Sequence, residues 1–516
     1  INGESARAKR QPRIGEIGPT GRTFPVSGSL RRLAIAVGVN LQRLGRMADF
    51  QNESLTFDPI HGYMPFTSGD GLPDGEIGER QLVDNPWVQR MRQIHQLQTA
   101  WWVFPSAEHT RFQHVLGVMH LGSRAVEALY PSLKQTCPDA PSRGYVESLV
   151  RIAGLLHDVG HGPFGHFFDE HYLSLFGLTH ETVGSAIVER ELADLVRRVR
   201  RNPTSALEDG ETLDPAHVAF LMTRPKSAAS SSQCTAAPRW LSMLQSLFSG
   251  IYTIDNMDFV LRDAYMSGYS ARAFDLDRLL RYSFFSSAGL TIHARGIDAL
   301  LRFMAVRAEL FRSVYFHRTV RAIDLTLKDL FVASRVLLFP GNPLEHLAEY
   351  CHFTEWSLLV DVARWTESDD PRKRVLGPRW QEFLARRIHW KMVAQRTLVY
   401  GPADAEQASI FSEPRFVEQA IRRMLPAAIS DVPLAIDLAR HVSRTHTRGA
   451  AAGQNFFFDP AHGKPRPLAD DQIFRQLPIA HRICRVYAED AQHAREIAAA
   501  LDQLIGPGSA DDLTNM

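Results

Sequence analysis

Apolar residues recur every three to four positions along most of this chain, and this spacing constrains the fold more than any other feature. The pattern is clear in residues 88–97, 111–129, 146–156 and 180–199, where it places apolar side chains on one face of a helix. Strand signals are sparse. With 45% apolar residues among 516, the chain can bury a large core. We therefore predict a mainly α-helical globular protein.

Breaks in this pattern predict the domain organisation. Residues 1–50 are basic and form an expected flexible arm, residues 51–345 form the helical core with a flexible insertion at about 223–238, residues 346–505 form a smaller helical region, and residues 506–516 form a disordered tail. The arm has the Arg-rich, acid-poor character of an organelle-targeting leader, but an ordinary basic arm is the interpretation that we prefer.

Charge and cysteine content narrow the classes of function. The 58 Lys and Arg residues balance 57 Asp and Glu residues, so no overall field attracts nucleic acid or an anionic membrane. No stretch approaches the roughly 18 apolar residues that span a bilayer. The 4 Cys residues are scattered, which argues against a zinc ribbon and suits a reducing compartment. We expect a cytoplasmic protein, with nuclear and organellar locations left open.

One segment, RIAGLLHDVGHGPFGHFFD, carries the strongest chemical signal. An apolar helix ends in His157 and Asp158, a glycine-rich bend carries His161, and a second helix opens with His166 and Asp169. Polar groups at the end of a buried helix need partners or a ligand, because unpaired polar groups in a core cost free energy. Imidazole and carboxylate groups suit Zn, Fe, Mn or Mg. The segment therefore predicts a divalent cation site without naming the metal.

Two distant segments supply similar side chains. Arg111 and His114 lie about one turn apart at the start of an amphipathic helix. Asp255, Phe259 and Asp263 recur at four-residue intervals and so lie near one face of another helix. Alone, either set is typical of structural or solvated polar residues, but together with the His-Asp segment they indicate a binding site.

The ordered motifs resemble the HD-domain deoxynucleoside triphosphate triphosphohydrolases. They are DPIHG (58–62), VFPSAEHTRFQH (103–114), HDVGHGPFGHFFD (157–169), THE (179–181), DNMDFVLRD (255–263) and YFHR (315–318). The resemblance implies an HD-domain helical phosphohydrolase core that binds a dNTP. It also implies a divalent metal ion and attack of water at the α-phosphorus, which yields deoxynucleoside and triphosphate.

The resemblance also implies roles for single residues. The metal ligands would be His114, His157, Asp158 and Asp255. The catalytic group would be His161, His166, Asp169, His180 and Glu181, with His166 as the proton donor. The substrate would contact Gln96, Leu97, Arg111, Asp263, Arg307 and Tyr315. Leu97 would crowd the 2′ position and so favour deoxyribose. The sequence leaves Fe, Mn, Zn, Mg and Ni undistinguished.

Three positions depart from the family pattern. Asn256 stands where a phosphate-binding Lys is expected, Phe259 replaces a Tyr, and Phe316 replaces a Gln. Each lost charge-assisted hydrogen bond weakens the phosphate clamp by about 1.5–3 kcal/mol. We expect either compensation by Arg312 or Arg318, or a substrate with fewer phosphates.

A guanine nucleotide activator is expected to act weakly or in an altered way. Asp84, Gln89 and Arg92 match the guanine-reading positions of the family, but Ser54 and Phe57 replace the basic and amide residues that would anchor phosphates. In the family such nucleotides lie between subunits. We therefore expect a homo-oligomer that depends little on the activator.

Two alternatives remain open at this point. An HD phosphohydrolase could act on a nucleoside monophosphate, a cyclic nucleotide or another phosphoester, which Asn256, Phe259 and Phe316 favour. A nucleic-acid-binding protein could use the same fold, although only the basic arm and the region after residue 350 support it.

Overall fold

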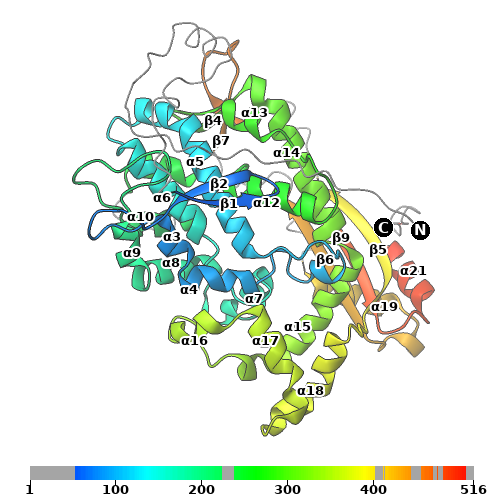
Figure 1. Ribbon diagram of the computed structural model, residues 1–516. Helices are drawn as coiled ribbons and strands as arrows, with labels where there is room; N and C mark the ends of the chain where they lie inside the picture. Colours follow the sequence, from blue (N-terminus) through cyan, green and yellow to red (C-terminus); the bar gives the residue numbers. More distant parts are fainter. Residues whose placement is uncertain are drawn as a thin grey trace, which may run out of the picture. The chain divides into compact units, whose positions relative to one another are not determined.

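The computed structural model describes residues 53–223, 237–400, 411, 413–442, 455–468, 474 and 480–506. The predicted arm, almost all of the predicted insertion and nearly all of the predicted tail lie outside these residues. The described part of the chain is mainly helical, as predicted (Figure 1). Within it, none of the helices combines the length and the apolar character needed to cross a bilayer.

Helices between residues 79 and 338 build the body around the site. They are α3 (Glu79–Val83), α4 (Pro86–Gln89), α5 (Arg111–Thr136), α6 (Arg143–Leu156), α7 (His166–His171), α8 (His180–Arg190), α9 (Ala193–Arg198), α10 (Pro215–Met222), α11 (Arg239–Gln245), α12 (Ile254–Met266), α13 (Leu276–Arg281), α14 (Ile297–Leu310) and α15 (Arg318–Leu338). A π-helical turn, η7 (Phe311–Tyr315), joins α14 to α15. Helix α6 is central, because its residues from Gly144 to Leu156 are all buried.

Two small sheets flank these helices. Strands β1 (Glu53–Asp58) and β2 (Gly62–Thr67) form an antiparallel hairpin. The second sheet has the order β3-β4-β7-β8 and comprises β3 (Ser283–Ser286), β4 (Gly289–His293), β7 (Asn455–Phe458) and β8 (Arg466–Pro467). Strands β4 and β7 pair in parallel, so a segment from beyond residue 450 completes a sheet of the core.

The region after residue 346 differs from the expected helical region. It begins with α16 (Leu347–His352), α17 (Glu355–Ala363) and α18 (Pro371–Leu384) and continues with β5 (Lys391–Tyr400), α19 (Pro414–Met424), β6 (Leu434–Val442), β9 (Ala480–Ala488) and α21 (Ala494–Ile505). The strands form an antiparallel sheet of order β5-β9-β6. The sheet was not predicted from the sequence because Arg482 and Arg485, which are buried within β9, interrupt the alternation of apolar residues that indicates a strand.

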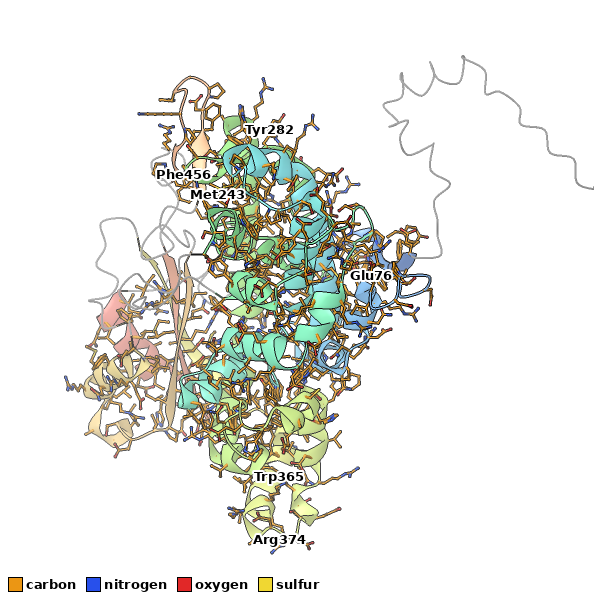
Figure 2. All side chains as sticks on the ribbon, turned by 90° about the vertical axis from the view of Figure 1, so that its left-hand side faces the viewer. Glu76, Met243, Tyr282, Trp365, Arg374 and Phe456 are labelled. Carbon is orange, nitrogen blue, oxygen red and sulfur yellow. The ribbon has the colours of Figure 1, made fainter. Side chains whose placement is uncertain are left out.

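The sheet β5-β9-β6 is covered on both faces. Helices α19 and α21 pack on one face, and the start of α15 packs on the other (Figures 1 and 2). Val417, Ile421, Val486, Ile497 and Leu501 belong to the apolar core of the first face. The helical body has its own core, and Figure 2 shows its side chains packed from Tyr282 at one end to Trp365 and Arg374 at the other.

Candidate metal centre and active-site cavity

The bend after α6 brings the polar side chains together. Helix α6 ends at Leu156, so His157 and Asp158 follow directly from the buried core. A Cβ atom on Gly160 would lie 2.0 Å from the carbonyl oxygen of His180, and only glycine permits this approach to α8. Gly165 adopts a φ of 57° and faces the Arg111 guanidinium. The glycines therefore fold the bend tightly against α5 and α8.

The side chains expected to bind a metal converge at this point. Nε2 of His114 lies 3.1 Å from Oδ1 of Asp255 and 3.9 Å from Oδ2 of Asp158. Nε2 of His157 lies 3.4 Å from Oδ1 of Asp158 and 3.6 Å from Oδ1 of Asp255. Ligand atoms of His114, His157 and Asp158 all lie within 4.8 Å of one another. We call these four residues the metal cluster.

Hydrogen bonds orient both rings of the metal cluster. Nδ1 of His114 donates to Oδ2 of Asp258 at 2.8 Å, and Nδ1 of His157 donates to the carbonyl oxygen of Gly154 at 2.9 Å. Each bond directs Nε2 toward the carboxylates of the cluster, as outer partners of metal-binding histidines do. Sequence reasoning missed Asp258, whose three-residue spacing from Asp255 on α12 was the available signal.

The metal cluster fits a divalent cation. Nε2 of His157 is buried and has no hydrogen-bond partner among the described residues. Burial alone would lower the pKa of His114, but hydrogen bonds to Asp255 and Asp258 raise this pKa to about 10. Burial would raise the pKa of Asp158, but His157 and Arg111 hold it well below its usual range. The ionised carboxylates of the cluster are therefore stabilised by nearby positive charge. A bound cation supplies this charge when the imidazole rings are neutral.

A second cluster of histidines surrounds Asp169. Oδ2 of Asp169 accepts a hydrogen bond from Nδ1 of His180 and lies 3.3 Å from Nδ1 of His166. The ring of His161 stacks on that of His180 with 3.8 Å between ring centroids. His161 is fully buried, and its Nε2 lies 3.4 Å from Oδ1 of Asp158. We call these residues the histidine relay, and His161 joins it to the metal cluster.

The exposed member of the histidine relay is His166, whose side chain is 65% exposed. Helix α7 begins with this residue, and the ring forms part of the cavity wall. Partial desolvation in the cavity, together with the charges of His180 and Arg111, lowers the pKa of His166 despite its contact with Asp169. The arrangement suits a proton donor that is held by a carboxylate and open to a ligand.

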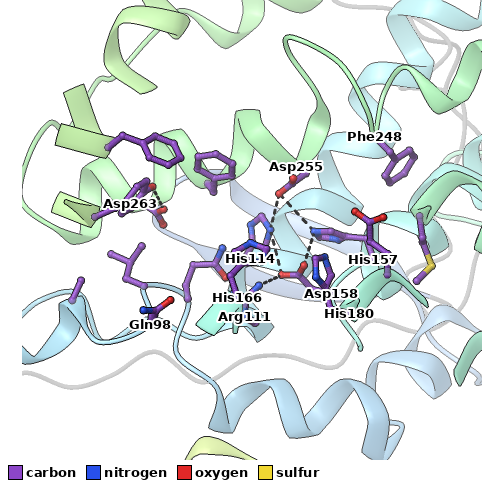
Figure 3. Close-up of a pocket in the computed structure, with 18 of the residues that line it drawn as sticks. Gln98, Arg111, His114, His157, Asp158, His166, His180, Phe248, Asp255 and Asp263 are labelled. Atoms are coloured by element: carbon purple, nitrogen blue, oxygen red, sulfur yellow. Dashed lines mark hydrogen bonds and ion pairs between the residues drawn. The ribbon is translucent and has the colours of Figure 1, made fainter. Parts of the chain in front are cut away.

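Both clusters border one cavity of about 360 Å³ (Figure 3). Its lining includes Gln96, Leu97, Gln98, Ala100, Arg111, His114, His157, Asp158, His166, His180, Glu181, Leu221, Met222, Thr223, Phe248, Ser249, Asp255, Phe259, Asp263, Phe311, Tyr315, Phe316, Val320, Arg321 and Asp324. Figure 3 shows Gln98 and Asp263 on one side of the metal cluster and Phe248 on the other. His161 and Asp169 lie behind this wall rather than in it.

The side of the cavity with Asp263 holds the residues expected to contact a sugar. Oε1 of Gln96 is buried without a hydrogen-bond partner among the described residues. Asp263 accepts hydrogen bonds from the Tyr315 hydroxyl and, at 2.8 Å, from Nε2 of His109. Leu97 is buried beside them. These side chains form a tight wall with a free acceptor, which suits a hydroxyl-bearing ring.

The cationic groups of the cavity differ in part from the expectation. Arg111 lines it, and its Nη1 donates to Oδ2 of Asp158 at 2.6 Å. Arg307, which was expected to contact the substrate, is not among the described lining residues, and its guanidinium lies over the ring of Phe311. Arg312 and Arg318 do not line the cavity either. Arg321, which sequence reasoning missed, does so from the first turn of α15.

The residues expected to bind an activator make contacts with one another. Nε of Arg92 donates to Oε1 of Gln89 at 2.8 Å, and Nε2 of Gln89 donates to the carbonyl oxygen of Val83 at 2.8 Å. The side chain of Asp84 is 61% exposed and pairs with Arg80. Phe57 is 69% exposed on β1. The amide of Gln89 is therefore used within the chain, while Asp84 stays accessible.

Comparison with known proteins identifies a family model and several relatives of this chain. Residues 111–221 match the HD domain family, which spans α5 to α10. The uncharacterized protein YwfO of Bacillus subtilis is 28% identical over 352 residues, 65% of this chain and 71% of that protein. The deoxynucleoside triphosphate triphosphohydrolase SAMHD1 homolog of Dictyostelium discoideum is 27% identical over 61% of this chain and 56% of its own length.

Human deoxynucleoside triphosphate triphosphohydrolase SAMHD1 is 29% identical over 54% of this chain and 44% of its own length. The chain thus spans about half the length of these two named relatives. A crystal structure of a hypothetical protein from Aquifex aeolicus matches 87% of this chain and 100% of its own with a TM-score of 0.61 and 20% identity, a likeness of fold alone. The chain therefore contains an HD domain and is related, at modest identity, to the HD-domain deoxynucleoside triphosphate triphosphohydrolases.

Proposed function

We propose that this HD-domain phosphohydrolase cleaves dNTPs to deoxynucleoside and triphosphate. The observation that carries the proposal is the single cavity that joins the metal cluster, the exposed ring of His166 and the wall formed by Leu97, Asp263 and Tyr315. In this proposal the metal cluster activates a phosphate, His166 donates a proton, and the wall binds the sugar.

The metal cluster would start the reaction by binding a cation. His114, His157, Asp158 and Asp255 would hold the divalent cation, which when bound polarises a phosphate oxygen and lowers the pKa of water. Water attacks the α-phosphorus, and the bond from phosphorus to the 5′-oxygen breaks.

His166 donates the proton that the departing 5′-oxygen needs, and Asp169 orients the His166 ring. His161 and His180 fix Asp169, and Glu181 lines the cavity at the start of α8. Arg111 binds the phosphate chain.

The sugar site favours deoxyribose. Gln96 offers a free acceptor to the 3′-hydroxyl, and the buried Leu97 leaves a 2′-hydroxyl without a hydrogen-bond partner. A buried hydroxyl that cannot pair costs binding energy. Asp263 and Tyr315, joined by their hydrogen bond, complete the same wall.

A second candidate function is hydrolysis of a phosphoester with fewer phosphates. Arg111 and Arg321 are the Lys or Arg side chains that line the cavity within the described residues, and both are already paired with carboxylates. Leu221, Met222 and Phe248 give the side beyond the metal cluster an apolar surface. These features favour a less charged substrate than a triphosphate.

Product analysis decides between the two. The purified protein is incubated with each dNTP and with deoxynucleoside monophosphates, in the presence of Mn²⁺ or Mg²⁺. The phosphorus products are then identified by ³¹P NMR. Inorganic triphosphate as the first product supports the dNTP reaction, whereas phosphate released only from the monophosphates supports the second candidate.

Assembly and activation belong to the same proposal. We infer a homo-oligomer with weak or altered guanine nucleotide control, because Ser54 and Phe57 offer no cation and Gln89 is engaged with Arg92 and Val83. The domain limits at residues 50, 345 and 505 also stay proposals.

A further inference from the structure

The end of the cavity next to the sugar site holds a group of polar side chains that the reaction itself does not require. Nε2 of Gln98 donates to Oδ1 of Asp324 at 2.8 Å, and Nη1 of Arg321 donates to Oδ2 of Asp324 at 3.1 Å. All three residues line the cavity. Gln98 follows Leu97 and adopts a φ of 52°, a conformation that costs free energy in a residue other than glycine. We call Gln98, Arg321 and Asp324 the distal group.

The C-terminal sheet holds Arg321 in place. Nε and Nη2 of Arg321 both donate to Oδ1 of Asp437, at 3.0 and 2.7 Å. In the register of the sheet Gln395, Arg485 and Asp437 are neighbours on β5, β9 and β6. Arg485 donates to Gln395 at 2.6 Å and lies 3.4 Å from Oδ2 of Asp437. Arg485 thus holds the Asp437 carboxylate in place, and this carboxylate in turn orients Arg321.

Arg321 keeps two donors for a ligand. A guanidinium carries five N–H groups, and the bonds to Asp437 and Asp324 use one on Nε, one on Nη2 and one on Nη1. Among the described residues, one N–H group therefore remains without a partner on each terminal nitrogen. The Arg321 side chain is 28% exposed, whereas those of Asp437 and Asp324 are 2% and 8% exposed. The Arg321 guanidinium is thus more exposed than either carboxylate that it pairs with.

An aromatic wall stands beside the distal group. The π-helical turn η7 and the residue after it carry Phe311, Tyr315 and Phe316, which line the same cavity. Such rings stack on any nucleobase, because every base presents a π-face. A base attached to a sugar at Asp263 and Tyr315 would therefore meet rings on its face and Arg321 at its edge.

We propose that Arg321 determines base specificity and that Asp437 is its positioning residue. The inference rests on the proposed function and names its preferred substrates. Two parallel N–H donors match two neighbouring acceptors, such as O6 and N7 of guanine or N3 and O2 of cytosine. On adenine the N6 amino donor lies next to N1 and N7, and on thymine the N3–H donor lies between O2 and O4, so that at these edges one N–H group of Arg321 faces another donor. The enzyme then prefers dGTP or dCTP to dATP and TTP.

The test compares kcat/KM on the four dNTPs for the wild type and for Arg321→Lys. Lysine keeps the positive charge beside Asp437 and Asp324 but lacks the fork. One bidentate contact discriminates by roughly 10- to 100-fold, so we expect dGTP or dCTP to exceed dATP and TTP by this factor in the wild type. The ratio should fall to about threefold or less in Arg321→Lys.

Two further variants complete the test. Asp437→Asn should reduce the same ratio between bases, which a loss of general stability would not change selectively. Lys328→Gln removes an exposed cation from the same helix outside the cavity and should leave the ratio unchanged. Equal kcat/KM on all four dNTPs in the wild type, or a ratio that Arg321→Lys leaves intact, would overturn the inference and leave the proposed function standing.

Calorimetric binding of the four free deoxynucleosides separates the inference from the proposed function. Tighter binding of deoxyguanosine or deoxycytidine that is lost in Arg321→Lys supports base reading even if no dNTP is hydrolysed. Absence of dNTP hydrolysis would reject the proposed function alone. Equal binding of all four nucleosides would reject the role of Arg321.

Discussion

Replacement of Asp258 by Asn should weaken metal binding without removal of any metal ligand. Asp258 is fully buried and accepts hydrogen bonds from His114 at 2.8 Å, from His61 at 2.7 Å and from Nε and Nη2 of Arg262 at 2.9 Å each. Asparagine retains one carbonyl oxygen and no charge, so it cannot serve both imidazole rings and the guanidinium. The His114 ring then loses the contact that directs its Nε2 into the metal cluster.

The structure allows the two costs of this change to be separated. Loss of an outer partner of a metal-binding histidine typically lowers metal affinity 10- to 100-fold, about 1.4–2.7 kcal/mol. Removal of one partner of a buried ion pair costs about 3–5 kcal/mol of folding stability. Arg262 keeps Asp58 at 2.7 Å, so the stability loss should lie near the lower end of that range.

The assay is calorimetric titration of the metal-free protein with Mn²⁺, alongside denaturant unfolding. Asp298→Asn is a matched control, because it removes an exposed carboxylate from the first turn of α14. A folded Asp258→Asn protein with unchanged Mn²⁺ affinity would refute the role given to Asp258. If this variant does not fold, His61→Gln removes a single contact to Asp258 and should weaken Mn²⁺ binding in the same direction by a smaller factor.

The other predictions concern metal, proton and sugar. His157→Ala should lose metal and hydrolysis together, whereas His166→Ala should keep metal and lose most turnover; normal metal content and turnover in His157→Ala, by elemental analysis and kinetics, would contradict this. Leu97→Ala should narrow the preference for dATP over ATP, and equal wild-type kcat/KM on both nucleotides would count against the sugar site. Metal affinity should fall about tenfold per pH unit below pH 10, because the metal displaces the proton on His114, and a pH-independent affinity would disprove it. Because this pKa is raised, protonation of His114 stabilises the metal-free protein fully below about pH 6.5, and this contribution is lost as the pH rises through about 10. Light scattering and dATP hydrolysis with and without GTP test assembly, and large activation by GTP would show that Ser54 and Phe57 were misinterpreted.

The sequence predicted the helical body and its central site because both depend on local patterns. The start of α8, for example, is capped locally by Thr179, whose side chain accepts from the backbone of Thr182. The motif around His157 keeps most of its polar groups within a dozen residues, so one helix end, one glycine-rich bend and the next helix start bring them near one another.

The partners that hold these groups could not be predicted in the same way. His61 lies 197 residues before Asp258, and Asp437 lies 116 residues after Arg321. The first contact joins the β1–β2 turn to α12 and the second joins β6 to α15, and no periodicity in the sequence indicates such pairings. The sheet β5-β9-β6 was missed for a related reason, because its inner face is polar where it holds α15.

Asp158 belongs to both halves of the site, and this shared position governs how substitutions should combine. Its Oδ1 lies 3.4 Å from Nε2 of His157 and 3.4 Å from Nε2 of His161, while its Oδ2 accepts from Arg111 at 2.6 Å. One carboxylate thus faces a metal ligand, the buried link to the histidine relay and the phosphate-binding cation. Removal of any of these three partners changes the charge felt by the other two. Residues in one such network do not contribute additively, so the loss of activity in a double variant of His161 and Arg111 should fall short of the sum of the single losses.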